Sequence, residues 1–461
     1  MLSTQKNPNT PVSDWTPESW RSRPALHQPT YACSQEHRQA LHVLARSPAL
    51  VSANKVLQLK ALIAQAQDGK RFILQGGDCA ESFAQCTSEA VASQLKVLQQ
   101  MSQVLMHRLQ MPVVCMGRLA GQYAKPRSCD TETLGADSLP VYRGDIVNDS
   151  EFEHDARRAD PGRLLKAHAH SASTLGFVRA LYETGIGELL MPKNWAMKWA
   201  DHLPERDTYL HTVQGVHHAL HFMNTLAGSD TDNFLHRDIF TSHEALLLDY
   251  EHGLTRQVPG FEGWFDLSTH FPWIGKRTAD LEGAHVEFCR GIRNPLGVKV
   301  GSDLSADELT ALIERLNPDN EPGRLTLIHR LGARDLREKL PALLNAVRRA
   351  GANVLWLCDP MHGNTETLAC GTKTRRFELI MAEIEAAFLV HSDHGTRLGG
   401  LHLELTGDDV SECLGGARDL QPEDLSRRYL SKVDPRLNYE QALELALRVA
   451  HLDTLQPGTR H

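Results

Sequence analysis

Four side chains of types that bind metal ions stand at or just beyond the ends of apolar runs. They offer a thiol, an imidazole and two carboxylates. Such a mixed donor set suits a borderline divalent ion such as manganese, cobalt, iron or zinc better than magnesium or calcium. No local spacing links the four residues, so a buried cysteine, a hydrogen-bonded histidine, a salt bridge and a turn cap remain as alternatives. The candidates are Cys79, His362, Glu404 and Asp434.

A second group of candidates is basic. Arginine binds phosphate or carboxylate through a bidentate fork and lysine supplies a compact charge, so these residues could hold two anionic groups. The alternative is that each is a surface cation with a solvated head. Lys299 and Arg330 each close an apolar run, where a buried charge needs a partner that an anion would supply. The basic candidates are Arg118, Lys125, Arg127, Arg277, Lys299 and Arg330, and the segment 121–128 (GQYAKPRS) adds the hydroxyl of Ser128.

These residues need elements that all end in the same place. Short apolar runs are typical of buried parallel strands, and in a (β/α)8 barrel the catalytic groups sit at the carboxyl ends of such strands. The predicted fold class is therefore α/β, a (β/α)8 TIM barrel with an N-terminal extension and inserted helices. The runs that carry candidates cover residues 72–79, 113–118, 297–299, 325–330, 354–362 and 401–404.

Length and composition limit the function classes. The chain has 461 residues, 41% of them hydrophobic and 23% charged, and a formal net charge of -8. These values predict a globular protein with no general attraction to nucleic acid or to an anionic membrane. The start has no apolar stretch typical of a secretory signal, and no run is long enough to span a membrane, so we expect a cytoplasmic protein. Nine cysteines without close pairs indicate reduced thiols.

The order of patterns along the chain predicts two parts. Residues 1–69 read as an N-terminal extension, with a proline-rich arm that carries Trp15 and Trp20 and two helical segments before the first strand. A partly disordered tail is the alternative for the arm. Residues 70–461 read as the catalytic barrel, with a polar, irregular stretch at 130–153 and an inserted helical segment around 161–230.

The chain closely resembles the type II class of 3-deoxy-D-arabino-heptulosonate 7-phosphate (DAHP) synthases. The similarity is carried by many short motifs spread between residues 74 and 438, a combination that chance does not produce. The motifs are 74–81 (LQGGDCAE), 121–128 (GQYAKPRS), 242–246 (SHEAL), 283–285 (GAH), 294–299 (NPLGVK), 322–327 (PGRLTL), 358–365 (CDPMHGNT), 406–417 (TGDDVSECLGGA) and 434–438 (DPRLN).

The resemblance implies a transferase that condenses phosphoenolpyruvate, erythrose 4-phosphate and water to DAHP and phosphate, the first step of the shikimate pathway. Manganese is the expected metal, with cobalt or another divalent ion as an alternative, and a homodimer or homotetramer and a chorismate mutase partner are expected. The family pattern implies four metal ligands: Cys79, His362, Glu404 and Asp434. It assigns phosphoenolpyruvate binding to Arg118, Arg277, Lys299 and Arg330, and the sugar phosphate to Lys125, Arg127 and Ser128. The catalytic residues it implies are Cys79, Lys299, His362 and Arg277.

Two positions depart from the family pattern. A glutamate commonly precedes the phosphoenolpyruvate-binding arginine, whereas this chain has Lys276 before Arg277. A cysteine often precedes the metal-binding aspartate, whereas this chain has Val433, so a redox pairing with Cys79 is not expected.

Two other functions stay open. One is a metal-dependent barrel aldolase that acts on a different phosphosugar. The other is a regulatory or scaffold protein that has lost catalysis at Lys276. Substitution of Cys79 separates enzyme from scaffold, because it should abolish turnover and leave partner binding intact. The sequence identifies neither a feedback effector nor the choice between primary and secondary metabolism.

Overall fold

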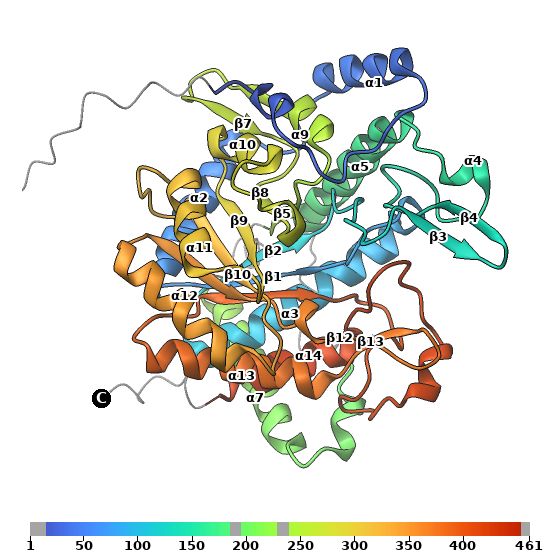
Figure 1. Cartoon of the computed structure of the whole chain (residues 1–461). Helices are drawn as coiled ribbons and strands as arrows, with labels where there is room; N and C mark the ends of the chain where they lie inside the picture. The colour runs from blue at the N-terminus through green and yellow to red at the C-terminus, as the bar shows by residue number, and fades with distance from the viewer. Residues whose placement is uncertain (1–14, 185–194, 228–238, 453–461) are drawn as a thin grey trace, which may run out of the picture.

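The computed structural model describes residues 15–184, 195–227 and 239–452. Eight parallel strands close into a barrel in the order β1-β14-β11-β10-β9-β8-β5-β2, at the centre of Figure 1. The six runs singled out in the sequence are all strands of this barrel, so the predicted fold class is confirmed. The barrel strands are β1 (Phe72–Gly77), β2 (Val113–Arg118), β5 (Ile239–Glu244), β8 (Phe271–Ile274), β9 (Leu296–Val300), β10 (Leu325–His329), β11 (Val354–Cys358) and β14 (Gly400–Glu404).

Alternation along each strand divides the core into an inner and an outer layer. On β10, Ile328 packs inside the barrel with Phe271 and Leu357, whereas Leu327 belongs to the cluster shared with the surrounding helices. Side chains on a strand point to opposite faces in turn, so His329 lies on the outer side with Leu327. All five residues of β10 are buried because both faces of the barrel wall are covered.

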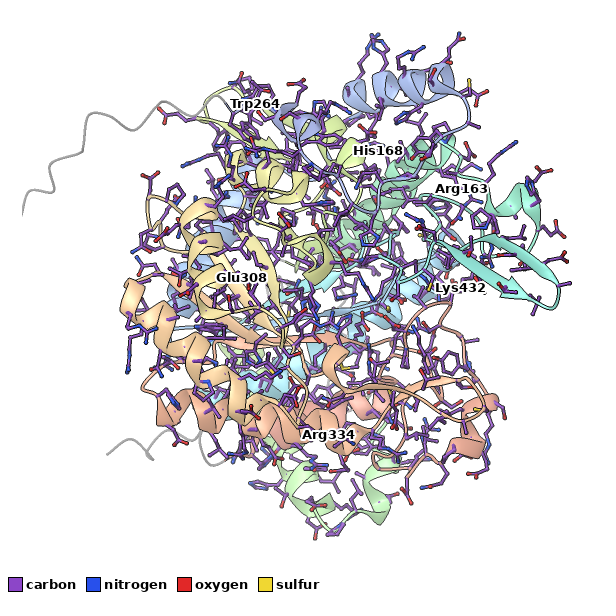
Figure 2. All side chains as sticks on the ribbon, viewed as in Figure 1. Arg163, His168, Trp264, Glu308, Arg334 and Lys432 are labelled. Carbon is purple, nitrogen blue, oxygen red and sulfur yellow. The ribbon has the colours of Figure 1, made fainter. Side chains whose placement is uncertain are left out.

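Helices cover the outside of the barrel, as Figure 1 shows. Their boundaries follow local rules. For example, α11 begins with a capping box, in which the side chains of Ser305 and Glu308 each accept the other's backbone N–H. Glu308 is labelled in Figure 2. The helices of this layer are α3 (Ser88–Leu109), α10 (Ala284–Gly291), α11 (Ala306–Leu316), α12 (Leu336–Ala350), α13 (Phe377–Asp393) and α14 (Tyr439–Ala450).

The two helices expected before the first strand are α1 (Ser34–Arg46) and α2 (Ala53–Gln67). On α2, Leu59 and Ile63 are buried in the same cluster as the residues inside the barrel. Because β1 starts only a few residues after α2, this helix closes the amino end of the barrel. In the arm, Trp20 is buried and Trp15 Nε1 donates to the Glu287 carbonyl. A site with access to ligand must therefore lie at the opposite, carboxyl end.

The stretch at 130–153 was predicted to be irregular, and this prediction is wrong in part. It contains an antiparallel hairpin of β3 (Thr131–Leu134) and β4 (Asp137–Pro140), in which Gly135 has a φ of 64°. Most side chains of the hairpin are exposed, so its sequence lacks the apolar alternation by which strands are recognised. The helices that follow are α4 (His154–Arg157), α5 (Gly162–Thr184) and α7 (Arg206–Ala227).

The predicted insertion around 161–230 covers α5 and α7, with parts of it outside the described residues. The described portion of the chain holds no helix that is both long and apolar enough to cross a membrane. The remaining short elements are η1 (Ser19–Ser22), η2 (Phe83–Gln85), η4 (Lys198–His202), α9 (Leu248–Leu254), β6 (Thr255–Gln257), β7 (Trp264–Asp266), η5 (Lys276–Thr278), η6 (His362–Asn364), β12 (Thr365–Thr367), β13 (Lys373–Arg375) and η7 (Pro422–Ser426).

Candidate active site

The carboxyl ends of neighbouring strands bring the first candidates together. Arg118 ends β2, Glu404 ends β14, and both pair in register with Gly77 at the end of β1. Gly77 has a φ of 146°, and a Cβ atom there would lie 2.6 Å from the Arg118 carbonyl oxygen. Glycine permits this close approach, and the chain then turns to place Cys79 beside both strand ends.

The four predicted metal donors lie together. Ligand atoms of Cys79, Glu404 and Asp434 lie within 4.8 Å of one another, and His362 Nε2 lies 3.1 Å from Glu404 Oε1. Cys79 and Glu404 are fully buried, whereas the side chains of His362 and Asp434 are 12% and 15% exposed. A cation would therefore enter this donor group from the side of His362 and Asp434.

The ammonium group of Lys125 lies within this donor group. Its Nζ atom is 2.9 Å from Cys79 Sγ and 2.9 Å from Asp434 Oδ2, and it is 3.2 Å from Glu404 Oε1. Buried acidic groups require a cation or equivalent partners close by. The donor group therefore fits a divalent metal ion, for whose positive charge the Lys125 ammonium stands in.

The protonation of the donors also bears on metal binding. Burial and the neighbouring Glu404 carboxylate raise the pKa of the Cys79 thiol to about 12. Burial opposes ionisation of Asp434, but the neighbouring cations Lys125, Arg375 and Lys373 together outweigh it and lower the pKa of this carboxyl. Thiolate is the form that binds a metal, so metal binding must release the Cys79 proton.

A cavity of about 280 Å³ lies beside the donor group, and its wall is mainly basic. Arg118 is buried, with its guanidinium 5.1 Å from the centre of the Trp273 ring. Lys299 forms an ion pair with Asp359, and burial lowers the pKa of Lys299 to about 8. Such a wall suits a ligand with several anionic groups. The cavity is lined by Arg118, Gln122, Lys125, Pro126, Glu244, Trp273, Gly275, Lys276, Arg277, Lys299, Arg330, His362, Thr365, Lys373 and Asp434.

Two of the predicted site residues, Arg127 and Ser128, do not line this cavity, although they directly follow Pro126, which does. Ser128 is connected to the cavity through Arg277, an exposed lining residue whose Nη2 atom donates to Ser128 Oγ at 2.8 Å. All the other predicted site residues line the cavity or belong to the donor group.

Two acidic residues of the site, Glu244 and Asp359, were not predicted from the sequence to be functional. Glu244 ends β5 and lines the cavity; burial raises its pKa, and its Oε1 atom has no hydrogen-bond partner among the described residues. Asp359 follows β11, pairs with Lys299 and lies 2.7 Å from His362 Nδ1, which orients the ring so that Nε2 faces Glu404. Their positions at strand ends, inside the segments 242–246 and 358–365, were the available signal.

The two departures from the family pattern have plain structural settings. Lys276 Nζ lies 2.9 Å from Asp303 Oδ1, so an ion pair offsets the charge that this residue adds at the cavity. Val433 packs in an apolar cluster with Cys79 and Tyr142. All nine cysteines are free, in agreement with the expected reduced thiols.

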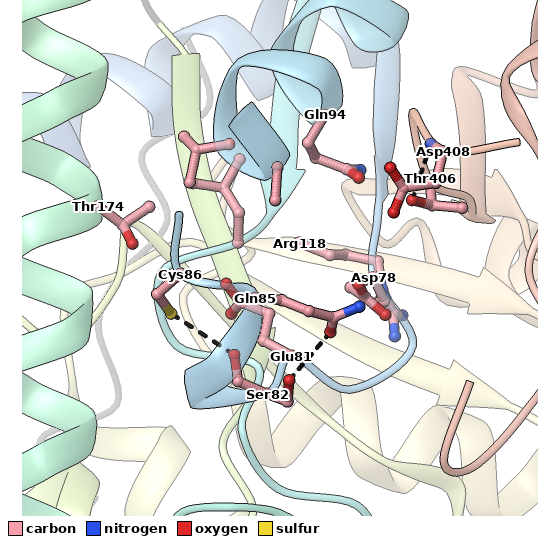
Figure 3. Close-up of a pocket in the computed structure, with 13 residues that line it drawn as sticks. Asp78, Glu81, Ser82, Gln85, Cys86, Gln94, Arg118, Thr174, Thr406 and Asp408 are labelled. Atoms are coloured by element: carbon pink, nitrogen blue, oxygen red, sulfur yellow. Dashed lines mark hydrogen bonds between the residues drawn. The ribbon is translucent and has the colours of Figure 1, made fainter. Parts of the chain in front are cut away.

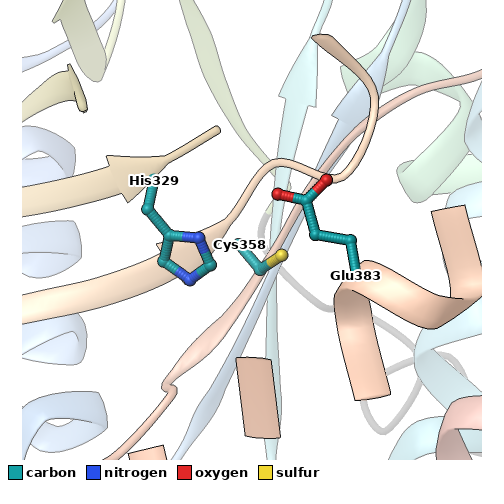
Figure 4. A group of neighbouring side chains, drawn as sticks. All are labelled: His329, Cys358 and Glu383. Atoms are coloured by element: carbon teal, nitrogen blue, oxygen red, sulfur yellow. The ribbon is translucent and has the colours of Figure 1, made fainter. Parts of the chain in front are cut away.

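A second group of potential donors lies on the outer side of the barrel wall. His329, Cys358 and Glu383 are buried and have ligand atoms within 4.8 Å of one another (Figure 4). Glu383 accepts hydrogen bonds from the Leu331 and Gly332 amides, and burial raises its pKa to about 8. Burial lowers the pKa of His329 to about 3. At neutral pH this second group (the His329 group) carries little negative charge. It therefore fits a cation less well than the group formed by Cys79, His362, Glu404 and Asp434 (the Cys79 group).

The fold and the site together define a class of protein: an α/β barrel with a group of potential metal donors beside a cavity rich in basic residues at its carboxyl end. The chain belongs to the class-II DAHP synthetase family, which matches residues 15–450. The resemblance inferred from the motifs is thus confirmed.

Two similar proteins cover nearly the whole chain. The phospho-2-dehydro-3-deoxyheptonate aldolase of Streptomyces coelicolor is 45% identical over 444 residues, which cover 96% of this chain and 98% of the relative. The protein of the same name from Neurospora crassa is 41% identical over 465 residues, with 97% and 96% covered. A solved structure of phospho-2-dehydro-3-deoxyheptonate aldolase from Francisella tularensis SCHU S4 covers 91% of this chain and 97% of its own, with 14% identity and a TM-score of 0.45. The fold assignment rests on the strand order itself and not on that last similarity.

Proposed function

We propose that this chain condenses phosphoenolpyruvate with erythrose 4-phosphate and water to form DAHP and phosphate, the first step of the shikimate pathway. The observation that carries the proposal is the position of a group of potential metal donors beside a cavity walled by Arg118, Lys299 and Arg330. Membership of the class-II DAHP synthetase family supports it, as do the names of relatives at 45% and 41% identity.

The basic wall would hold the anionic substrates. Phosphoenolpyruvate carries a carboxylate and a phosphate, and arginine forks with a buried lysine suit both groups. Cations that are already buried and held by Asp359 and Trp273 lose little freedom when the ligand binds. We assign Arg118, Arg277, Lys299 and Arg330 to phosphoenolpyruvate, and Lys125, Arg127 and Ser128 to the sugar phosphate.

The metal would be held by Cys79, His362, Glu404 and Asp434. A divalent ion bound there, for which manganese is the expected choice and cobalt an alternative, would polarise the aldehyde of erythrose 4-phosphate. Asp359 keeps Nδ1 of His362 engaged, so that Nε2 is presented to the metal.

The reaction also needs a water molecule in a defined place. Carbon 3 of phosphoenolpyruvate bonds to the aldehyde carbon, positive charge develops at carbon 2, and water adds there before the C–O bond to phosphate breaks. The proton that the water loses balances the one that the aldehyde oxygen gains. Glu244, a cavity carboxyl whose Oε1 atom has no hydrogen-bond partner among the described residues, suits the task of orienting this water.

A coupled assay tests the proposal. Protein stripped with a chelator is assayed for loss of phosphoenolpyruvate and release of phosphate, with and without erythrose 4-phosphate and with and without Mn²⁺ or Co²⁺. We expect loss and release in equal amounts only when both substrates and the metal are present. Equal loss with another aldose phosphate but not with erythrose 4-phosphate would point to a different aldolase, and metal binding without any turnover would point to a scaffold.

Three further expectations stay predictions. They are a homodimer or homotetramer, a chorismate mutase partner and a cytoplasmic location. Sedimentation of the purified protein, alone and mixed with chorismate mutase, tests the first two, and localisation of a tagged chain tests the third.

A further inference from the structure

We propose that Glu81 is a positioning residue that fixes the substrate-binding segment 119–128 against the metal-binding segment 78–82. The inference rests on the proposed function, because it takes Lys125 as a substrate contact. Glu81 itself does not line the cavity at the donor group, so it acts through the residues that it holds. Figure 3 shows it, with Arg118 and Asp78, among the residues that line a separate, much smaller cavity of about 50 Å³.

The Glu81 carboxylate gathers three consecutive backbone N–H groups. Oε2 accepts from Ala120 at 2.9 Å, and Oε1 accepts from Gly121 at 2.9 Å and from Gln122 at 2.7 Å. The backbone N–H of Glu81 donates in turn to the Gln122 carbonyl at 2.7 Å. Four hydrogen bonds therefore join one residue of the first segment to three of the second.

The backbone held by Glu81 is one that the chain would otherwise avoid. Ala120 has a φ of 60°, the left-handed region that residues with a Cβ atom seldom adopt. At Gly121, a Cβ atom would lie 2.2 Å from His243 Nδ1, so the segment passes close to the β5 side chain. The three N–H groups converge on Glu81 in this conformation, so their hydrogen bonds favour it.

The segment carries this constraint directly to the site. Gln122 is buried, and its Oε1 atom accepts the backbone N–H of Glu244 at 2.9 Å, which ties the segment to the end of β5. Three residues further on, Lys125 reaches Cys79 and Asp434. A shift of the segment would therefore displace the Lys125 ammonium and the residues after it, and displacements of about 1 Å can cost on the order of 100-fold in rate.

The test compares Glu81→Gln and Glu81→Ala with the natural chain. Gln keeps one oxygen for Gly121 and Gln122 and presents an NH₂ group to Ala120, whereas Ala removes all three acceptor contacts. Glu444→Gln is the matched control, because Glu444 is a buried carboxylate that accepts the Ala417 N–H and does not line the cavity. Hydrogen–deuterium exchange of the peptide spanning 117–128 measures the loop directly and needs no turnover.

We expect exchange in this peptide to accelerate in the order natural chain, Glu81→Gln, Glu81→Ala, and to stay unchanged in Glu444→Gln. The KM for erythrose 4-phosphate should rise about 10-fold in Glu81→Gln and more in Glu81→Ala, with a smaller rise in the KM for phosphoenolpyruvate. Unchanged exchange would overturn the inference, as would faster exchange with both KM values unchanged. Absence of DAHP formation in the natural chain would instead refute the proposed function, while the exchange result would still show whether Glu81 holds the segment.

Discussion

Two groups of cysteine, histidine and acidic residues lie near the carboxyl end of the same barrel, yet their surroundings differ. The Cys79 group adjoins the cavity, and the Lys125 ammonium contacts its thiol and carboxylates. The His329 group lies between the barrel wall and the helices, and its acidic residue, Glu383, accepts hydrogen bonds from two backbone N–H groups. Residue types alone therefore do not define a metal site; access and local charge decide it.

The sharpest way to break this comparison is to remove one thiol from each group. We expect Cys79→Ser to weaken Mn²⁺ or Co²⁺ binding by at least about 100-fold and to abolish turnover, because one of the four proposed metal ligands is lost. Cys358→Ser, at a fully buried site with no role in the proposed metal binding, should leave metal affinity within about twofold. Metal titration of both proteins gives the result. Equal losses in the two variants would mean that the second group also binds metal.

The next largest effect is expected at Asp359, which follows β11 and contacts His362 of the Cys79 group. Asp359→Asn removes the negative charge that orients His362 and pairs with Lys299. Loss of such a supporting contact costs about 10- to 100-fold in metal affinity or activity. Isothermal titration with Mn²⁺ measures it, and Asp303→Asn, which removes the partner of Lys276 at the edge of the cavity, is the control expected to leave metal affinity unchanged. An unaltered affinity in Asp359→Asn would contradict the orienting role.

The pH dependence of substrate binding tests the basic wall. Burial lowers the pKa of Lys299 to about 8, so this residue is charged below that pH and becomes neutral above it. Phosphoenolpyruvate affinity should therefore fall as pH rises through about 8, by up to tenfold per pH unit. Lys299→Arg should remove this inflection, because arginine stays charged. Quenching of tryptophan fluorescence by phosphoenolpyruvate, with Trp273 at the cavity, provides the titration; the same inflection in Lys299→Arg would assign it to another group.

The smallest effect concerns the stability of the second group. Burial raises the pKa of Glu383 to about 8 from an ordinary value of 4.5. The folded form retains a proton that the unfolded form has lost, so the stability gained from this raised pKa is full below about pH 4.5 and disappears as pH rises to 8. Glu383→Gln cannot titrate, and its free energy of unfolding relative to the natural chain should increase by about 2 kcal/mol between pH 6 and pH 8.

Urea unfolding of the Glu383→Gln variant and the natural chain at several pH values measures this change. Metal affinity should be unaffected. A relative stability that does not vary with pH would show that Glu383 is ionised in the folded protein, which would remove one difference between the two groups.

The barrel and most of its site could be predicted because the strands are short apolar runs that end in charged or metal-binding residues. Which face of each strand points into the barrel could not be predicted. Alternation separates Ile328 from His329, but it does not say which of them faces the barrel axis. Only the closed strand order places His329 and Cys358 away from the cavity, although each directly precedes a residue that faces the active site.

Other omissions have similar physical causes. Glu244 and Asp359 carry no local pattern that distinguishes a site carboxylate from an ordinary ion pair. The role of Asp359 depends on its contacts with Lys299, which lies on another strand, and with the ring of His362. The role of Glu244 depends on its place in the cavity wall. The exposed hairpin of β3 and β4 lacks apolar alternation. The helical pattern of α2 was predictable, but not that its apolar residues would close the barrel.

The most direct measurement is a crystal structure with Mn²⁺ and phosphoenolpyruvate bound, with anomalous diffraction data collected to locate the metal. We predict one strong anomalous peak, bounded by Cys79, His362, Glu404 and Asp434, with the ligand against Arg118 and Lys299 in the neighbouring cavity. A peak between His329, Cys358 and Glu383 instead, or a ligand bound away from the basic wall, would contradict the account.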